Sequence, residues 1–172
     1  MVARVVRSPT VLTPIRPVVR YKIPISTLVL VYTPGLAVLL LERADFPGHW
    51  QSVTGSQEPG ETLAETARRE LAEETGIDAA LYGGVVDWKM HNDFEIFRQW
   101  AHRYAPGTTH NTEHVFGLAV PTEVPVTLAP REHLRFAWLP WREAAARCFS
   151  WTNQAAIEAL PAHLAVQTRK LA

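Results

Sequence analysis

The chain has 172 residues, of which 47% are hydrophobic and 20% charged, a composition typical of a globular domain with its own core. Basic and acidic residues both number 17, so no net charge attracts nucleic acid or a membrane surface, and we expect neither as a partner. Any anionic ligand must therefore be held by local cations. The single cysteine, Cys148, excludes an internal disulfide and is typical of a cytoplasmic protein.

The N-terminal segment, residues 1–20, differs in composition from the rest of the chain. It contains four arginines, three prolines and no acidic residue. We interpret it as a loosely ordered arm ahead of a single domain over residues 21–172. No apolar run in the sequence reaches the ~18 residues that a membrane-spanning helix requires.

Two strands are predicted at the start of the domain, over residues 22–32 and 36–41. The first is rich in β-branched residues, and Thr33-Pro34-Gly35 is a turn signal between the two. The second is almost entirely apolar, which is typical of a strand covered on both faces. Lys22 and Arg43 are the early cations that lie at the ends of these strands.

A helix of about four turns is predicted over residues 62–75. Thr62 and Glu65 have the spacing of a capping box, and Gly76 follows the last turn, where a left-handed cap is favoured. On a helical wheel, the apolar stripe is formed by Leu63, Ala67 and Leu71.

This helix has acidic residues on its apolar side. At about 100° per residue, Glu70 and Glu74 fall within or against the apolar stripe, and Glu73 lies beside it. Buried carboxylates require a compensating cation, and Arg69 can neutralise only one of them. Oxygen ligands suit Mg²⁺ or Mn²⁺, so the helix predicts a divalent-metal site. The alternative is a charged surface helix whose acids pair with its own arginines.

The remaining elements are predicted in the order strand, strand, strand, strand, helix, helix. Residues 81–91 and 94–104 predict two long strands joined at Asn92-Asp93, and residues 113–120 and 134–138 predict two more. Residues 121–130, with three prolines, predict an irregular segment. Pro140 is the predicted first residue of a helix that continues over residues 141–147. A final helix starts after Ser150 and ends at about Leu160, before Pro161. Together these elements predict an α/β domain with a mixed sheet.

The histidines do not have a metal-binding spacing, so the sequence does not predict a zinc site. The residues concerned are His91, His102, His110, His114 and His133.

The segment from Gly55 to Ile77 has a distinctive spacing. It reads Gly, five residues, Glu61, seven residues, and then Arg-Glu-Leu-x-Glu-Glu-x-Gly-Ile. This pattern resembles the Nudix box, and the chain resembles a Nudix hydrolase. The resemblance implies a Nudix fold with a mixed β-sheet sandwiched between helices (α/β/α) and a metal-dependent cleavage of phosphoanhydride bonds.

The resemblance also implies roles for the residues of the box. Glu70 and Glu74 would be the primary ligands of Mg²⁺, with Mn²⁺ as the alternative ion, and Glu73 would be a further ligand or a nearby acid. The carbonyl of Gly55 would also touch the metal. Arg69 and Glu61 would pair to fix the loop against the helix.

Sequence outside the box narrows the resemblance to the bacterial dihydroneopterin triphosphate diphosphatases of folate synthesis, over about residues 21–160. It is carried by Phe94 to Phe97, residues 102–107, Asn111-Thr112-Glu113, residues 132–134 and Ser150-Trp151-x-Asn153. Dihydroneopterin monophosphate and pyrophosphate would be the products.

This closer resemblance implies further site residues. Those that would bind substrate are Lys22, Arg43, Thr54, Phe94, Glu95, Ile96, Phe97 and Ser150. Glu132 would be a third metal carboxylate, and Glu73 and Glu132 are the candidates for the general base. The expected catalytic set is thus Glu73, Glu74 and Glu132.

Two alternatives stay open. The first is another Nudix substrate, such as nucleoside triphosphates, dinucleoside polyphosphates or RNA 5′ ends. The second is a Nudix-like domain that binds a nucleotide without cleaving it, which the loss of a box glutamate would mark. No box glutamate is lost.

Overall fold

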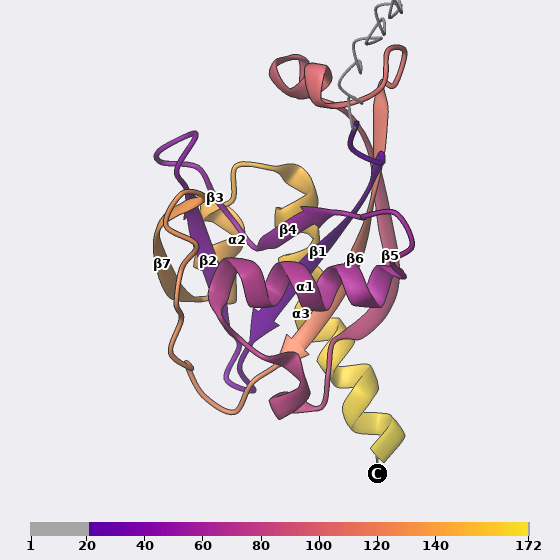
Figure 1. Ribbon diagram of the computed structural model, residues 1–172. Helices are drawn as coiled ribbons and strands as arrows, with labels where there is room; N and C mark the ends of the chain where they lie inside the picture. Colours follow the sequence, from indigo (N-terminus) through magenta and orange to yellow (C-terminus); the bar gives the residue numbers. More distant parts are fainter. Residues whose placement is uncertain (1–20, 172) are drawn as a thin grey trace, which may run out of the picture.

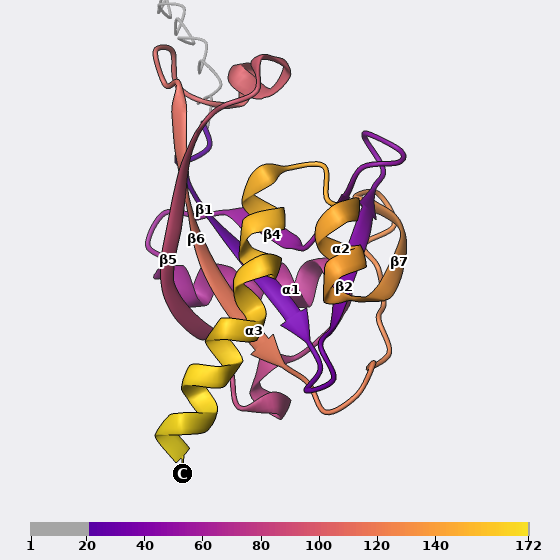
Figure 2. The same ribbon diagram turned by 180° about the vertical axis from the view of Figure 1, so that it is seen from behind.

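The computed structural model describes residues 21–171, so the expected arm over residues 1–20 lies outside the described residues. Figure 1 shows a twisted sheet with α1 across one face, and Figure 2 shows α2 and α3 on the opposite face. The strands are β1 (Ile25–Tyr32), β2 (Ala37–Arg43), β3 (Trp50–Gln51), β4 (Val53–Ser56), β5 (Val86–Glu95), β6 (His110–Ala119) and β7 (His133–Pro140). The helices are α1 (Leu63–Thr75), α2 (Trp141–Arg147) and α3 (Trp151–Leu171), with 3-10 turns η1 (Ala79–Tyr82) and η2 (Arg98–Arg103). The predicted α/β/α arrangement of a mixed sheet is confirmed.

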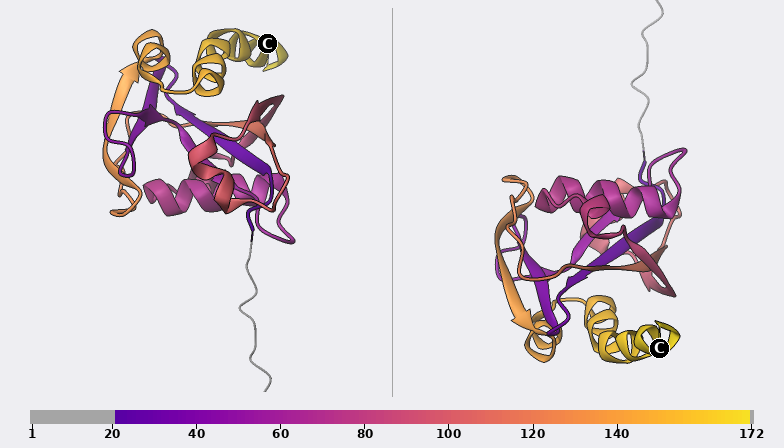
Figure 3. Two further views of the ribbon diagram at one scale, coloured as in Figure 1. Left: turned by 90° about the horizontal axis from the view of Figure 1, so that it is seen from above. Right: turned by 90° about the horizontal axis from the view of Figure 1, so that it is seen from below.

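The sheet divides beside its central strand. β1 pairs in parallel with β6, which pairs antiparallel with β5. On its other side β1 pairs with β4 over Ser26 to Val29, but it meets β2 only at Tyr32 and Val38. β2 then leaves β1 and pairs with β7 and β3. The views along the sheet in Figure 3 show the β2–β7 pair diverging from β1 and β6.

β1 shows how the sequence forms two cores. Because successive side chains of a strand point to opposite faces, Leu28, Leu30 and Tyr32 pack toward α2 and α3. Val29 and Val31 pack toward α1 with Ala67 and Leu71 of that helix. Every residue in these two sets is at most 2% exposed. The alternation therefore determines which of the two cores each side chain of β1 joins.

α1 forms as its cap signals predict. The Thr62 side chain accepts from the Glu65 backbone N–H, and the Glu65 carboxylate accepts from the Thr62 N–H, so the capping box is complete. Gly76 ends the helix with a φ of 69°, the left-handed conformation that glycine adopts without strain. The box helix is thus fixed at both ends before any ligand is considered.

The prediction of a turn at Asn92-Asp93 is wrong. Both residues lie inside β5, which runs on to Glu95, and residues 98–103 form η2 instead of a strand. Asn92 pairs with Glu113 and Asp93 with Thr112, whose hydroxyl donates to the Asp93 carboxylate at 2.6 Å. The ladder with β6 satisfies these backbone groups, so the pairing overrides the local turn preference.

The prediction that the last helix ends before Pro161 is also wrong, because α3 continues to Leu171. A proline inside a helix removes one hydrogen bond and bends the axis, and Figure 2 shows α3 changing direction along its length. Leu160 before the proline and Leu164 after it both pack against the same core cluster. This packing on both sides of Pro161 offsets the lost bond. None of the described helices is long and apolar enough to cross a membrane.

Pro140 ends β7 and occupies the cap position, so α2 begins one residue later than predicted, at Trp141. The segment over residues 121–130 is irregular, as predicted. Residues 50–56, for which the sequence predicted no strand, form the short strands β3 and β4.

Candidate active site

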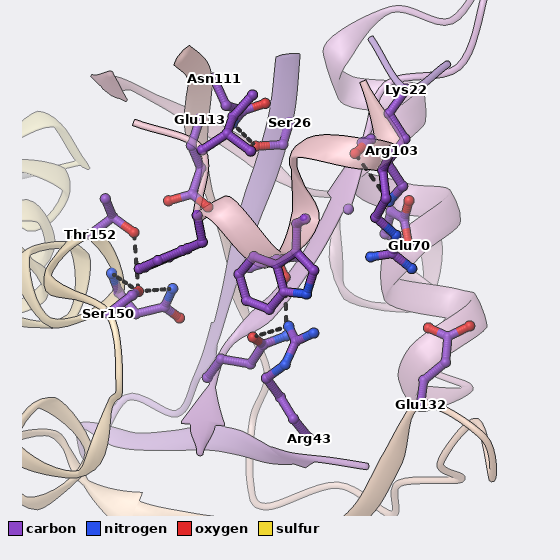
Figure 4. Close-up of a pocket in the computed structure, with 18 of the residues that line it drawn as sticks. Lys22, Ser26, Arg43, Glu70, Arg103, Asn111, Glu113, Glu132, Ser150 and Thr152 are labelled. Atoms are coloured by element: carbon purple, nitrogen blue, oxygen red, sulfur yellow. Dashed lines mark hydrogen bonds between the residues drawn. The ribbon is translucent and has the colours of Figure 1, made fainter. Parts of the chain in front are cut away.

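One cavity of about 750 Å³ gathers residues from both halves of the divided sheet, from α1 and from the start of α3. Figure 4 shows a close-up of its lining. Every site residue expected from the sequence lines it: Lys22, Arg43, Thr54, Gly55, Glu70, Glu73, Glu74, Phe94, Glu95, Ile96, Phe97, Glu132 and Ser150. The structure thus brings the expected residues together in one place.

The innermost acid of the cavity is Glu74, which is 3% exposed. Burial raises the pKa of its carboxyl, an effect opposed by the nearby His133. Glu74 Oε2 lies 3.1 Å from His133 Nε2, yet the two atoms lack the geometry of a hydrogen bond and have no other partner. The exposed Glu132 lies beside them. One ligand atom from each of these three residues lies within 4.8 Å of the others.

Glu70 is held against the loop that precedes the helix. Gly55 has no side chain, and a β-carbon at this position would lie 1.8 Å from Glu70 Cδ. The carboxylate therefore occupies space that any other residue would fill. Burial raises the pKa of Glu70 to about 7, although Arg69 beside it acts in the opposite direction. Only glycine at position 55 permits this placement.

Arg69 connects the loop to the helix acids. Its Nε lies 2.7 Å from Glu61 Oε1, so the expected pairing with Glu61 is present. Its Nη1 lies 2.8 Å from Glu70 and 3.1 Å from Glu73, and its Nη2 donates to the carbonyl of Ser56 at 3.1 Å. The hydrogen bond from Arg69 lowers the pKa of Glu61 to about 2. One positive charge thus faces three carboxylates. The end of the cavity formed by Glu70, Glu73, Glu74 and Glu132, which we call the acidic end, therefore keeps an excess of negative charge.

The residues at this acidic end fit a divalent metal ion. Glu74 Oε2 is buried and without a hydrogen-bond partner, as are both ring nitrogens of His133. A buried carboxylate oxygen without a donor is costly, and a cation relieves that cost. Two carboxylates and an imidazole form a donor set that divalent ions accept. His133 was not expected from sequence spacing, because it reaches Glu74 only through the pairing of β7 with β2.

Cations flank the acidic end. Lys22 donates to Ser56 Oγ at 3.4 Å, and its pKa is lowered by partial burial and by the neighbouring Arg103. The guanidinium of Arg43 donates to both carboxylate oxygens of Asp45, at 2.9 and 2.7 Å, and to Gln51 at 2.9 Å. These hydrogen bonds hold the Arg43 side chain in a fixed orientation beside the cavity.

Aromatic rings form a wall of the same cavity. Phe97, which is 44% exposed, contacts Trp100 with a centroid separation of 5.2 Å and Phe149 with one of 6.4 Å. The Arg43 guanidinium lies over Trp100, 4.9 Å from its centroid. Such surfaces suit a flat heterocycle. Sequence reasoning identified Phe97 but missed Trp100, because residues 98–103 were read as a strand.

A second polar group lies at the other end of the cavity, on the α3 side of the sheet. It consists of Ser26, Asn111, Glu113 and Thr152, and we call it the ring end. Figure 4 shows these four side chains together, apart from Glu70 and Glu132. Ser26 and Thr152 were not singled out by sequence, and Asn111 and Glu113 were noted only as part of the resemblance. The period of two along β6 places both on the face that Val115 buries, which is the signal that could have found them.

Cys148 has no role in this cavity. It is not among the lining residues, and burial raises the pKa of its thiol to about 12. A thiol with that pKa is protonated at neutral pH and is a poor nucleophile.

Comparisons with known proteins agree with this geometry. The NUDIX domain profile matches residues 22–160. The dihydroneopterin triphosphate diphosphatase of Escherichia coli is 47% identical over 140 residues, which are 80% of this chain and 92% of that protein. The Haemophilus influenzae protein of the same name is 40% identical, covering 81% and 88%. The structure of the E. coli dihydroneopterin triphosphate pyrophosphohydrolase superposes with a TM-score of 0.75 at 46% identity, over 80% of this chain and 94% of that one.

Proposed function

The chain belongs to the NUDIX domain family, and on that premise we propose that it hydrolyses dihydroneopterin triphosphate to dihydroneopterin monophosphate and pyrophosphate, as a step of folate biosynthesis. One observation carries the proposal: the residues expected to bind metal, phosphate and ring line a single cavity of about 750 Å³. The 47% identity to a diphosphatase of this name supports the choice of substrate. A cytoplasmic location, expected from the single Cys148, remains a prediction.

The acidic end would hold the metal ion, for which we propose Mg²⁺. Glu70, Glu74 and Glu132 are its proposed carboxylate ligands, His133 is the imidazole of the donor set described above, and Glu73 and the Gly55 carbonyl are further contacts. When bound, the ion neutralises phosphate charge and lowers the pKa of a coordinated water. Arg69 would position Glu70 and Glu73 through the contacts described above.

The cations and the loop would hold the triphosphate. Lys22 and Arg43 present positive charge to the cavity, and Thr54 lies next to Gly55 on β4. Charge-assisted hydrogen bonds from such groups are shorter and stronger than neutral ones, so they orient a phosphate chain as well as bind it. The aromatic wall beside Arg43 would then receive the ring, and Ser150 would close the site at the start of α3.

The reaction itself needs one proton acceptor. The oxygen of water bonds to phosphorus, the phosphoanhydride bond breaks, and pyrophosphate leaves with the electron pair of that bond. The water proton passes to a carboxylate, for which Glu73 and Glu132 are the proposed candidates. Both side chains are exposed, so either can reach a water molecule at the mouth of the cavity.

A panel of triphosphates tests this function. Dihydroneopterin triphosphate, dATP, GTP, a dinucleoside tetraphosphate and 5′-triphosphate RNA would be assayed with Mg²⁺, resolving pyrophosphate from orthophosphate. We expect the highest kcat/KM for dihydroneopterin triphosphate, with pyrophosphate as the product. A higher kcat/KM for dATP or RNA would overturn the substrate assignment but not the assignment as a hydrolase. Binding without turnover, with Mg²⁺ and with Mn²⁺, would indicate a nucleotide-binding domain instead.

A further inference from the structure

The Glu113 carboxyl group is buried in the cavity with no role in the chemistry described above. It is 5% exposed, and its Oε1 has no hydrogen-bond partner. It lies on β6, which contributes none of the proposed metal ligands. An unpaired buried acceptor is costly to keep, so its position facing a ligand cavity requires an explanation.

The neighbours of Glu113 are all uncharged. Ser26 lies opposite it on β1, Asn92 opposite it on β5, and Thr152 approaches from α3. Asn111 donates from Nδ2 to Ser26 Oγ at 2.7 Å, and this leaves its Oδ1 buried and unpaired as well. The ring end therefore presents two unpaired acceptors to the cavity. What it lacks is a group that donates two hydrogen bonds.

Asn92 is the one described neighbour that has an unpaired donor, its buried Nδ2. It does not line the cavity, whereas Glu113 and Asn111 do. Glu113 Oε1 and Asn92 Nδ2 are both without partners, so the protein leaves this carboxylate available to a ligand.

We propose that Glu113 determines specificity for the ring, by accepting hydrogen bonds from the adjacent ring N–H and exocyclic amine of a 2-amino-4-oxopyrimidine, with Asn111 as a second acceptor. This inference rests on the proposed function, because the pterin of dihydroneopterin contains that ring. The aromatic wall holds the faces of the ring, and Glu113 recognises its donor edge. The proposal adds a recognition group to residues 94–97, the expected ring-contacting segment.

Such an arrangement discriminates by the penalty that it imposes on the wrong ring. A ring that places an acceptor next to its amine, as adenine does, leaves one oxygen unpaired or in repulsion with a ring nitrogen. A site built to bind substrate N–H groups rejects analogues that lack them far more strongly than an apolar pocket rejects a change in size. Glu113 would therefore exclude ordinary adenine nucleotides from a site that can hold any triphosphate.

The test compares Glu113→Gln with wild type on two substrates, dihydroneopterin triphosphate and dATP. Gln keeps the shape of the side chain but replaces one acceptor with a donor. Loss of the two hydrogen bonds that the ring donates to Glu113 predicts a fall of about 100-fold in kcat/KM for the pterin. For dATP we expect kcat/KM to stay the same or to rise, because glutamine removes the repulsion between the carboxylate and the acceptor nitrogen of adenine. Asp93→Asn is the matched control: this carboxylate is exposed on β5, binds Thr112 and does not line the cavity.

A second readout does not depend on turnover. Dihydroneopterin without phosphates, titrated against the metal-free protein by its own fluorescence, should bind wild type and Asp93→Asn more tightly than Glu113→Gln. If Glu113 is only structural, Glu113→Gln lowers kcat/KM for both substrates by the same factor. The affinity for dihydroneopterin then falls only in proportion to the fraction of protein that is unfolded. An unchanged pterin preference in Glu113→Gln also overturns the inference. Neither result contradicts the proposed function. That function fails only if the wild-type protein has a higher kcat/KM for another triphosphate.

Discussion

Burial raises the pKa of both Glu70 and Glu113 to about 7, but the two side chains lie at opposite ends of the cavity and have different neighbours. At the acidic end, Glu70 has charged neighbours of both signs in Arg69, Glu73 and Glu74. At the ring end, only burial and the Thr152 side chain act on the pKa of Glu113. The first environment has excess negative charge and suits a cation. The second has unpaired acceptors and no charged neighbour, and it suits a neutral donor. One cavity thus separates reaction chemistry from recognition.

The largest expected effect comes from the buried acid of the acidic end. Glu74→Gln removes the negative charge that faces His133 and Glu132, and the proposed metal site loses a ligand. We expect kcat for pyrophosphate release to fall by about a thousandfold or more. Glu158→Gln, an exposed change on α3, should leave kcat unaltered. A loss of less than tenfold in Glu74→Gln would remove the acidic end from the mechanism.

Gly55→Ala tests the same end without changing a charge. The new β-carbon would displace the end of the Glu70 side chain, which is flexible, so the change moves a functional group at little cost in stability. We expect a fall of about 100-fold in kcat, since small misplacements at reacting centres have effects of this size. The free energy of unfolding, measured in urea, should change by less than about 1 kcal/mol.

Gly35→Ala is the control for this prediction, because a β-carbon there meets nothing closer than 3.8 Å. If Gly55→Ala retained wild-type kcat, the close approach of Glu70 to the loop would have no catalytic importance. A large loss of stability with unchanged kcat per folded molecule would point to the same conclusion.

The two ends also differ in how far the sequence predicted them. The cap residues Thr62 and Gly76 and the spacing of the box are local signals, so α1 and its acids followed from the sequence directly. His133 and Glu113 carry no local signal of function. Each reaches the cavity through the pairing of strands distant in sequence, β7 with β2 and β6 with β1. Pro161 was misjudged for the same reason, since the contacts on both sides of it are tertiary.

The ring end makes its own prediction for stability. An acid whose folded pKa lies near 7 stays protonated in the folded chain while the unfolded chain ionises above its ordinary pKa of 4.5. The free energy of unfolding therefore decreases as pH rises from 4.5 to about 7, and this decrease levels off above pH 7. Its neighbours Ser26, Asn92 and Thr152 do not titrate in this range, so the effect belongs to Glu113.

Glu113→Gln removes the pH-dependent decrease in stability, because glutamine does not ionise. Relative to wild type, its free energy of unfolding should increase by about 2 kcal/mol between pH 5 and pH 8. Urea unfolding at the two pH values measures the difference, and Glu158→Gln controls for the exchange of an exposed glutamate. A difference that does not vary with pH would mean that Glu113 is ionised in the folded protein, and the two ends of the cavity would then resemble one another.

The smallest effect is expected from Arg69→Lys, which separates the charge of Arg69 from its geometry. Lysine keeps the positive charge but cannot bind Glu61 with two parallel hydrogen bonds while reaching Glu70, Glu73 and the Ser56 carbonyl. We expect the free energy of unfolding to fall by about 1 kcal/mol and kcat by about tenfold, with the pterin-to-dATP preference unchanged. Arg68→Lys, next to it on the exposed side of α1, is the control. A change in preference would show that the acidic end also takes part in recognition, and the division between the two ends would not hold.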